Sequence, residues 1–490
     1  MSNVTDAAGR AAARPKAPTT HKPAIDIIID RHYSSKVYTS GSTISGRAVI
    51  QPTRDVPFDF FDIVFTGIAA TRLDFVQQYP SHSFRPFMKL RMPLSESDLP
   101  ESRIFKAGET YSIPFHFVVP HHLAMGACKH QCDNPAVQDH HLRLPPSVGF
   151  WGADDQAPEM AQVEYAIKAR AIQGGIPGGP TATKAMEGQH ILKVLPATPE
   201  DAPLDITFRD ERYTLLKSKT IRKNLFSAKT GKLTVASSQP SAVMFSADGR
   251  QSSTSTAHVG LEFFPDSADT TPPKINSVSG KLVSTTFFGA APADHLPNLG
   301  PRTSYHSTPC LNYMTTTSLF NSSVDKVSWN QEKVPAPRRD SGYSSSHMDD
   351  VVMENADAQA KKNASPFKHT TKLEIPFTVK NCNRKFFLPT FHSCLISRTY
   401  SLQLTLSVGP TNTTFTLSLP LQIGVETIND PQGGDLPSFE SVMAQTEEDE
   451  ADVYLRPRIR RLPSDEVPQM NTLLPGYDEL NRRARAVPVA

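Results

Sequence analysis

The sequence predicts an all-β protein built from two tandem β-sandwiches followed by a polar tail. Apolar and polar residues alternate over 162–171 and again over 400–423, which is the period of a strand with one buried face. Many short apolar runs are separated by turn residues, whereas amphipathic helical patterns are few. The apolar share of 38% and the 42 prolines indicate that part of the chain lies outside any core.

Strands are expected throughout both halves. In the first half they are predicted at 25–29, 44–50, 61–70, 113–119, 162–171 and 190–195. In the second half they are predicted at 204–209, 232–236, 258–264, 281–287, 400–408 and 415–423. The last two form a hairpin around the turn Gly409-Pro410-Thr411-Asn412, with one wet face and one dry face.

The local amino-acid composition indicates where the domains begin and end. We expect a disordered N-terminus over 1–24, a first sandwich over 25–195 and a second over 196–425. A largely disordered insertion is expected at about 291–368, and a disordered tail at 426–490, because both are rich in proline and polar residues.

Charge, hydropathy and cysteine content narrow the class of protein. The formal net charge of +2 gives no reason to expect nucleic acid as a partner. We find no apolar stretch of signal-peptide or membrane-span length, so peripheral membrane contact at most is expected. Five irregularly spaced cysteines are not a disulfide framework. These features favour a cytoplasmic, reduced protein.

The tail carries a short proline–aromatic motif, Leu474-Pro475-Gly476-Tyr477. Pro475 restricts the backbone to an extended form, so docking in an aromatic-lined groove costs little entropy, and Tyr477 supplies the anchor. A weaker copy consists of Leu436, Pro437 and Phe439. A chance match in a proline-rich linker is the alternative to a binding motif.

The order of several strings resembles fungal arrestin-like proteins of the alpha-arrestin class. The matching strings are YTSGSTISGRAVI at 38–50, FKAGETYSIPFHFVVP at 105–120, HLRLPPSVGFW at 141–151, VEYAIKARAI at 163–172, GKLTVASSQPSAVMF at 231–245, KLEIPFTV at 372–379 and LPTFHSCLISRTYSLQLTL at 388–406. The resemblance implies two immunoglobulin-like arrestin sandwiches, no enzymatic activity and no cofactor. It implies a scaffold that selects plasma-membrane transporters or receptors and is recruited to the plasma membrane and endosomes.

The resemblance also implies that the tail recruits a HECT-class ubiquitin ligase through its WW domains. The ligase-binding motif of the family is ideally Pro-Pro-x-Tyr, whereas this chain has Leu474 at the first position. One proline fewer predicts weaker docking through Pro475 and Tyr477. An arrestin-fold structural subunit of an endosomal sorting coat, without a ligase, is the alternative function.

A cluster of histidines and cysteines occupies 121–141. Thiolate and imidazole are the natural ligands of zinc, and a set of Cys128, His130, Cys132 and His140 is the candidate metal site. The alternative is an ordered loop between strands without metal. A zinc-dependent enzyme around this cluster is a third function, although the phosphate-binding loop, nucleophile-elbow and His-Glu-x-x-His motifs are all absent from the sequence.

Three further residues have candidate roles. Arg398 is in register with the dry face of its predicted strand, so it either lies at the rim with its head in water or joins the two sandwiches through an ion pair. Ser341 and Ser345 lie in a serine-rich stretch after Arg338 and Arg339, a pattern that kinases recognise.

Overall fold

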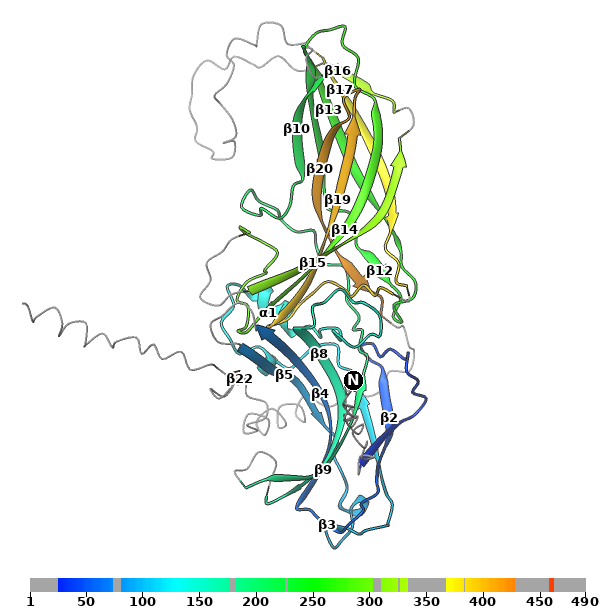
Figure 1. Ribbon diagram of the computed structural model, residues 1–490, viewed down its shortest axis with the longest axis vertical. Coiled ribbons are helices and arrows are strands. Elements are labelled where there is room, and N and C mark those ends of the chain that lie inside the picture. Colours follow the sequence, from blue (N-terminus) through cyan, green and yellow to red (C-terminus); the bar gives the residue numbers. More distant parts are fainter. Residues whose placement is uncertain are drawn as a thin grey trace, which may run out of the picture.

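The computed structural model confirms that the chain is mostly β-strand. It describes residues 25–73, 81–175, 181–224, 228–302, 310–324, 327–333, 367–382 and 384–427, together with the backbone of 458–461. The strands form two lobes that follow one another along the long axis of the molecule (Figure 1). The tail motifs at 436–439 and 474–477 and the serines at 341 and 345 lie outside the described residues.

The first lobe contains two antiparallel sheets and a short ribbon. One sheet has the order β1-β2-β7, and the other has the order β22-β5-β4-β8-β9. Their bounds are β1 Ile25–Ile29, β2 Thr43–Ile50, β4 Phe60–Leu73, β5 Ser81–Arg91, β7 Tyr111–Val118, β8 Ala161–Gln173 and β9 Thr183–Leu192. The ribbon pairs β3 (Val56–Pro57) with β6 (Ile104–Phe105), and the 3₁₀ turn η1 (Glu96–Asp98) lies between them in the chain.

The second lobe also contains two antiparallel sheets, each of five strands. One sheet has the order β10-β11-β13-β17-β16, and the other has the order β15-β14-β19-β18 with β20 also paired to β19. Their bounds are β10 Leu216–Arg222, β11 Lys229–Ser237, β13 Thr254–Pro265, β14 Ile275–Gly289, β15 Cys310–Ser323, β16 Asn330–Lys333, β17 Phe367–Thr378, β18 Phe391–His392, β19 Ile396–Val408 and β20 Thr413–Leu421. A parallel pair, β12 (Val243–Phe245) and β21 (Ile423–Val425), completes the lobe.

The alternation of apolar and polar residues explains why one face of strands β19 and β20 is buried and the other is more exposed. Along β19, Tyr400, Leu402 and Leu404 are buried, and the residues between them are partly exposed. Strands β19 and β20 pair from Tyr400–Leu421 to Val408–Thr413, so the predicted hairpin is confirmed. Gly409 and Asn412 both adopt positive φ, as a tight turn between two twisted strands requires.

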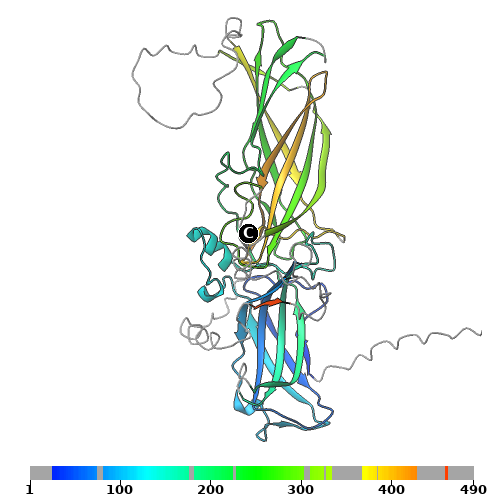
Figure 2. The same cartoon turned by 60° about the vertical axis from the view of Figure 1, so that its left-hand side comes forward.

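Three segments differ from the sequence-based expectation. Strands β15 and β16 lie inside the range 291–368 that was expected to be a largely disordered insertion. The segment 204–209 is not a strand, and the Asp210 carboxylate accepts hydrogen bonds from the backbone and hydroxyl of Thr207, which favours a turn. The backbone of β22 (Arg458–Arg461), from the tail expected to be disordered, pairs with the outer edge of β5 (Figure 2).

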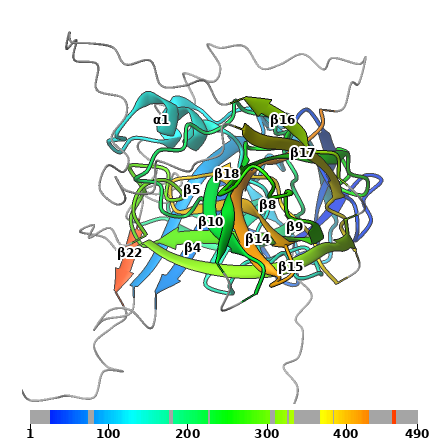
Figure 3. The ribbon, with the colours of Figure 1, turned by 90° about the horizontal axis from the view of Figure 1, so that it is seen from above.

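Helices are few and short among the described residues. One α-helix, α1 (Pro135–Leu142), and the 3₁₀ turn η2 (Met125–Ala127) lie between β7 and β8 in the chain. Helix α1 lies beside the place where the lobes meet (Figure 1) and at the side of the molecule when it is seen from above (Figure 3). No helix in the described part of the chain has the length and apolarity needed to cross a membrane.

Candidate metal centre at the junction of the lobes

The loop before β8 forms much of the contact between the lobes. The indole of Trp151 stacks on the ring of Phe386 in the second lobe, with centroids 4.0 Å apart. Two backbone hydrogen bonds flank this stack, from the amide of Asp154 to the carbonyl of Arg384 and from the amide of Phe386 to the carbonyl of Asp154. The adjacent Gln156 accepts hydrogen bonds at its side-chain oxygen from the hydroxyls of Ser284 and Thr315. The junction therefore combines an aromatic stack with hydrogen bonds.

Arg398 lies at the centre of this junction and is 0% exposed. Its Nη1 donates to the carbonyl oxygen of Asp155 at 2.9 Å, and its Nε donates to the hydroxyl of Thr286 at 2.9 Å. A position at the rim with the head in water is therefore wrong. Arg398 does join the two halves, but among the described residues its partners are a carbonyl and hydroxyls instead of the expected carboxylate.

Helix α1 begins at a well-formed cap. The side chain of Asn134 accepts a hydrogen bond from the amide of Val137, and Pro135 occupies the first helical position, where no amide donor is needed. The cap fixes the start of the helix, and with it the direction of each side chain in its last turn. The imidazole of His141 consequently points into the protein and is almost completely buried.

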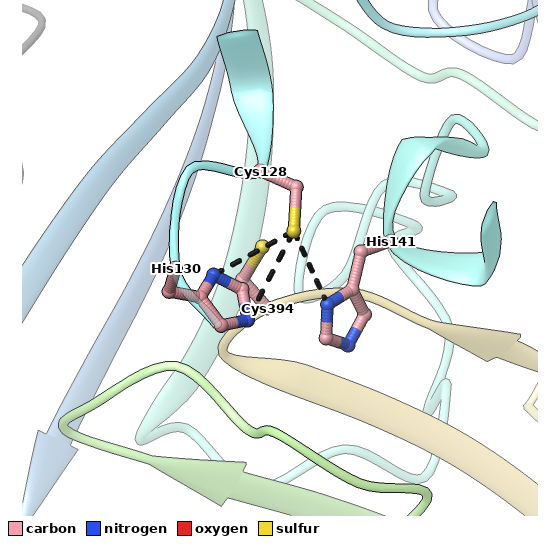
Figure 4. Close-up of side chains that lie close together, drawn as sticks. All are labelled: Cys128, His130, His141 and Cys394. Atoms are coloured by element: carbon pink, nitrogen blue, oxygen red, sulfur yellow. Dashed lines mark hydrogen bonds between the residues drawn. The ribbon is translucent and has the colours of Figure 1, made fainter. Parts of the chain in front are cut away.

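Cys128, His130 and His141 converge on one point (Figure 4). The Sγ atom of Cys128 lies 3.6 Å from Nδ1 of His130 and 3.6 Å from Nδ1 of His141. Cys394 completes a group of four whose ligand atoms all lie within 4.8 Å of one another. Cys128 follows η2, and His130 lies in the loop that leads to α1.

Cys394 comes from the second lobe, in the tight turn between β18 and β19. The backbone of that turn is held by hydrogen bonds from the amide and the hydroxyl of Ser393 to the carbonyl of Ile396. The carbonyl of Cys394 accepts from the amide of Ala293, and the carbonyl of Ala293 lies 2.9 Å from Nε2 of His130. The thiol thus reaches the cluster from a part of the chain more than 250 residues away from Cys128.

Burial dominates the titration of these groups. It lowers the pKa of His141 to about 4 and raises the pKa of the Cys128 and Cys394 thiols. The Arg85 guanidinium opposes the upward shift at both thiols. Arg85 is buried, and its Nη2 donates to the carbonyl of Ala127 beside Cys128. Burial thus favours the neutral form of the Cys128, His141 and Cys394 side chains.

Of the set predicted from sequence, Cys128 and His130 lie in the group of four, and Cys132 and His140 do not. His140 points away from the cluster, and its ring lies edge-on against His392 of β18, with centroids 5.3 Å apart. His141 takes its place, because successive residues of a helix point about 100° apart. Cys132 lies near the cluster, with its Sγ 3.9 Å from that of Cys128. It is outside the group of four that Cys394 completes.

Sequence reasoning missed Cys394 altogether. Its neighbours along the chain are apolar or small, and nothing near 394 resembles metal-ligand spacing. The one available signal was a histidine two residues before the cysteine, His392, in a segment that precedes the predicted strand at 400–408. The pairing of β18 with β19 is what places the thiol of Cys394 against the first lobe.

Comparisons with known proteins do not assign the chain to a group. A scan against protein-family models found no match, and a search of curated proteins found no match either.

Proposed function

We propose that this chain is an arrestin-like adaptor, and not an enzyme, that links plasma-membrane cargo to a HECT-class ubiquitin ligase. In this proposal each lobe is an arrestin sandwich of the immunoglobulin type, and the lobes grip transporters or receptors. The tail motif Leu474, Pro475 and Tyr477 docks in the WW domains of the ligase. Tethering raises the effective concentration of the ligase at the lysines of the cargo.

The observation that carries the proposal is the match between the resemblance and the strand pattern. The strings that resemble alpha-arrestins fall on strands of both lobes, including β2, β7 and β8 in the first and β11, β17 and β19 in the second. These strings follow one another along the chain in the same order as the two pairs of sheets. That agreement supports the proposal that the chain is arrestin-like. The dense junction around Arg398 supports a body that presents both lobes as one surface.

A binding measurement between the full chain and an isolated WW domain tests the recruitment step. We expect Tyr477→Ala to reduce the affinity at least tenfold, because the aromatic anchor supplies most of the buried area. We expect Leu474→Pro to increase the affinity, because it restores the second proline of the motif and stiffens the peptide further.

Tyr454 provides the matched control, since it lies in the same tail without a proline two residues before it. Tyr454→Ala should bind the WW domain as the unmodified chain does. Equal binding by the Tyr477→Ala variant and the unmodified chain would remove the ligase from the proposal. The sorting-coat alternative predicts that result, together with unchanged assembly of the chain with its coat partners.

A further inference from the structure

We propose that the junction of the two lobes holds a structural zinc ion, bound by Cys128, His130 and His141 of the first lobe and Cys394 of the second. The group offers two thiols and two imidazoles, a common ligand set of closed, four-coordinate zinc sites. Three of the four residues are buried, so solvent has little access to the position that the ion would take.

The spacing of the ligand atoms fits a tetrahedron of the right size. With Zn–S near 2.3 Å and Zn–N near 2.05 Å, a tetrahedral ion separates a sulfur from a nitrogen by about 3.6 Å. The Sγ of Cys128 lies 3.6 Å from Nδ1 of His130 and 3.6 Å from Nδ1 of His141. These two edges of the tetrahedron are already in place.

A hydrogen bond to His130 selects the nitrogen that would bind. Nε2 of His130 lies 2.9 Å from the carbonyl oxygen of Ala293, and a carbonyl only accepts, so this nitrogen carries the proton. Nδ1 then keeps its lone pair and faces Cys128. A backbone carbonyl that orients a histidine through its other nitrogen is the usual outer shell of a zinc site.

The same hydrogen bond favours Cys394 over Cys132 as the fourth ligand. The Sγ of Cys132 lies 3.6 Å from Nε2 of His130, the nitrogen that Ala293 occupies. A metal ion bound by Cys132 and by this nitrogen would have to break that hydrogen bond, although the same Sγ also lies 3.8 Å from Nδ1 of His141 and 3.9 Å from the Sγ of Cys128. Cys394 avoids this conflict, because it belongs to the group around Cys128 and its own carbonyl is fixed by Ala293.

The Arg85 guanidinium is the positive charge that favours thiolates at this site. Arg85 is buried against Cys128, and its Nε has no hydrogen-bond partner among the described residues. A buried guanidinium is stabilised by nearby negative charge. Two thiolates and one Zn²⁺ leave the site formally neutral, with the residual negative charge on the sulfurs near Arg85. Zinc binding would displace one proton from each thiol.

Metal analysis of the full chain, purified under reducing conditions and without chelator, tests the proposal. We expect about one zinc per chain in the unmodified protein and in Cys132→Ala, and at least tenfold weaker zinc binding in Cys394→Ala. A protein that contains no zinc and binds none on titration would overturn the site. Unchanged affinity in Cys394→Ala would overturn the bridge between lobes.

Cobalt substitution keeps the test decisive if a variant folds poorly. Tetrahedral Co²⁺ absorbs strongly in the visible range, and its thiolate bonds give a near-ultraviolet charge-transfer band whose intensity scales with the number of thiolates. We expect the folded Cys394→Ala variant, loaded with excess Co²⁺, to lose about half of that band, because one of two sulfur ligands is gone. A full band in this variant would contradict the assignment. Failure of the ligase experiment would leave this result untouched.

Discussion

Single side chains decide how the junction responds to its surroundings. His392 is buried beside His140, and its Nδ1 has no hydrogen-bond partner among the described residues. Burial lowers the pKa of His392 to about 3, and the neighbouring His140 and His141 act in the same direction. The folded protein therefore keeps this imidazole neutral at a pH where the unfolded chain protonates it.

Replacement of His392 should make the protein less sensitive to acid. Below the unfolded pKa of about 6.5 the unfolded chain binds a proton that the folded chain excludes, so stability falls as the pH falls towards about 3. This single group contributes a loss of up to about 1.4 kcal/mol per pH unit. We expect the free energy of unfolding of His392→Phe, measured by denaturant titration, to fall less between neutral pH and about pH 5.

His258 offers the matched control for this experiment, because its side chain is 65% exposed. The pH dependence of His392→Phe is compared with that of His258→Phe, in which an exposed histidine is replaced by the same residue. The measurement is made with chelator present, so that loss of metal from His141 does not contribute. An unchanged pH dependence in His392→Phe would show that the buried imidazole is not the acid-sensitive group.

At the scale of elements, the sequence predicts strands that have one apolar and one polar face. It misses strands whose two faces are equally polar. Strand β19 was predictable because Tyr400, Leu402 and Leu404 alternate with polar residues. Strand β15 was missed because it is an edge strand with both faces largely exposed, and residues such as Thr315 and Ser318 carry no apolar alternation. The turn at Thr207 shows the opposite error, since local hydrogen bonds outweigh an apparent alternation.

The candidate site was predictable only where its residues are close in sequence. Cys128 and His130 could be selected by residue type and proximity. The choice between His140 and His141 required the phase of helix α1, and Cys394 required the pairing of β18 with β19. Tertiary structure supplies both of these, and the composition of the segment 121–141 supplies neither.

The cap of α1 is the element that should affect both stability and metal binding. Asn134→Ala removes the acceptor for the amide of Val137 and should lower the free energy of unfolding by about 1 kcal/mol. Because α1 also carries His141, we expect zinc affinity to fall in the same variant. Denaturant titration and competition with a zinc indicator measure the two effects.

Asn134→Ser provides the control, because a serine hydroxyl accepts the same hydrogen bond. It should restore both the stability and the zinc affinity. If Asn134→Ala lowered stability but left zinc binding at the level of the unmodified protein, the helix would not be what positions His141.

On the scale of the whole molecule, two β-rich lobes meet through several contacts. They include the stack of Trp151 on Phe386, the hydrogen bonds of Arg398 and Gln156, and the proposed zinc ligands. A ligand set drawn from both lobes would couple their folding, because a bound ion stabilises only the arrangement that brings all four donors together. Such coupling would let the adaptor that we propose present both lobes to its cargo as one surface.

Hydrogen exchange of the full chain with zinc and after chelation tests this coupling most directly. The segments 128–134 and 393–396 belong to different lobes and are joined in this account by one ion. We predict that the amides of both segments become less protected together when zinc is removed, and that both regain protection when it is added back. A response confined to 128–134, with 393–396 unaffected, would contradict a metal bridge between the lobes.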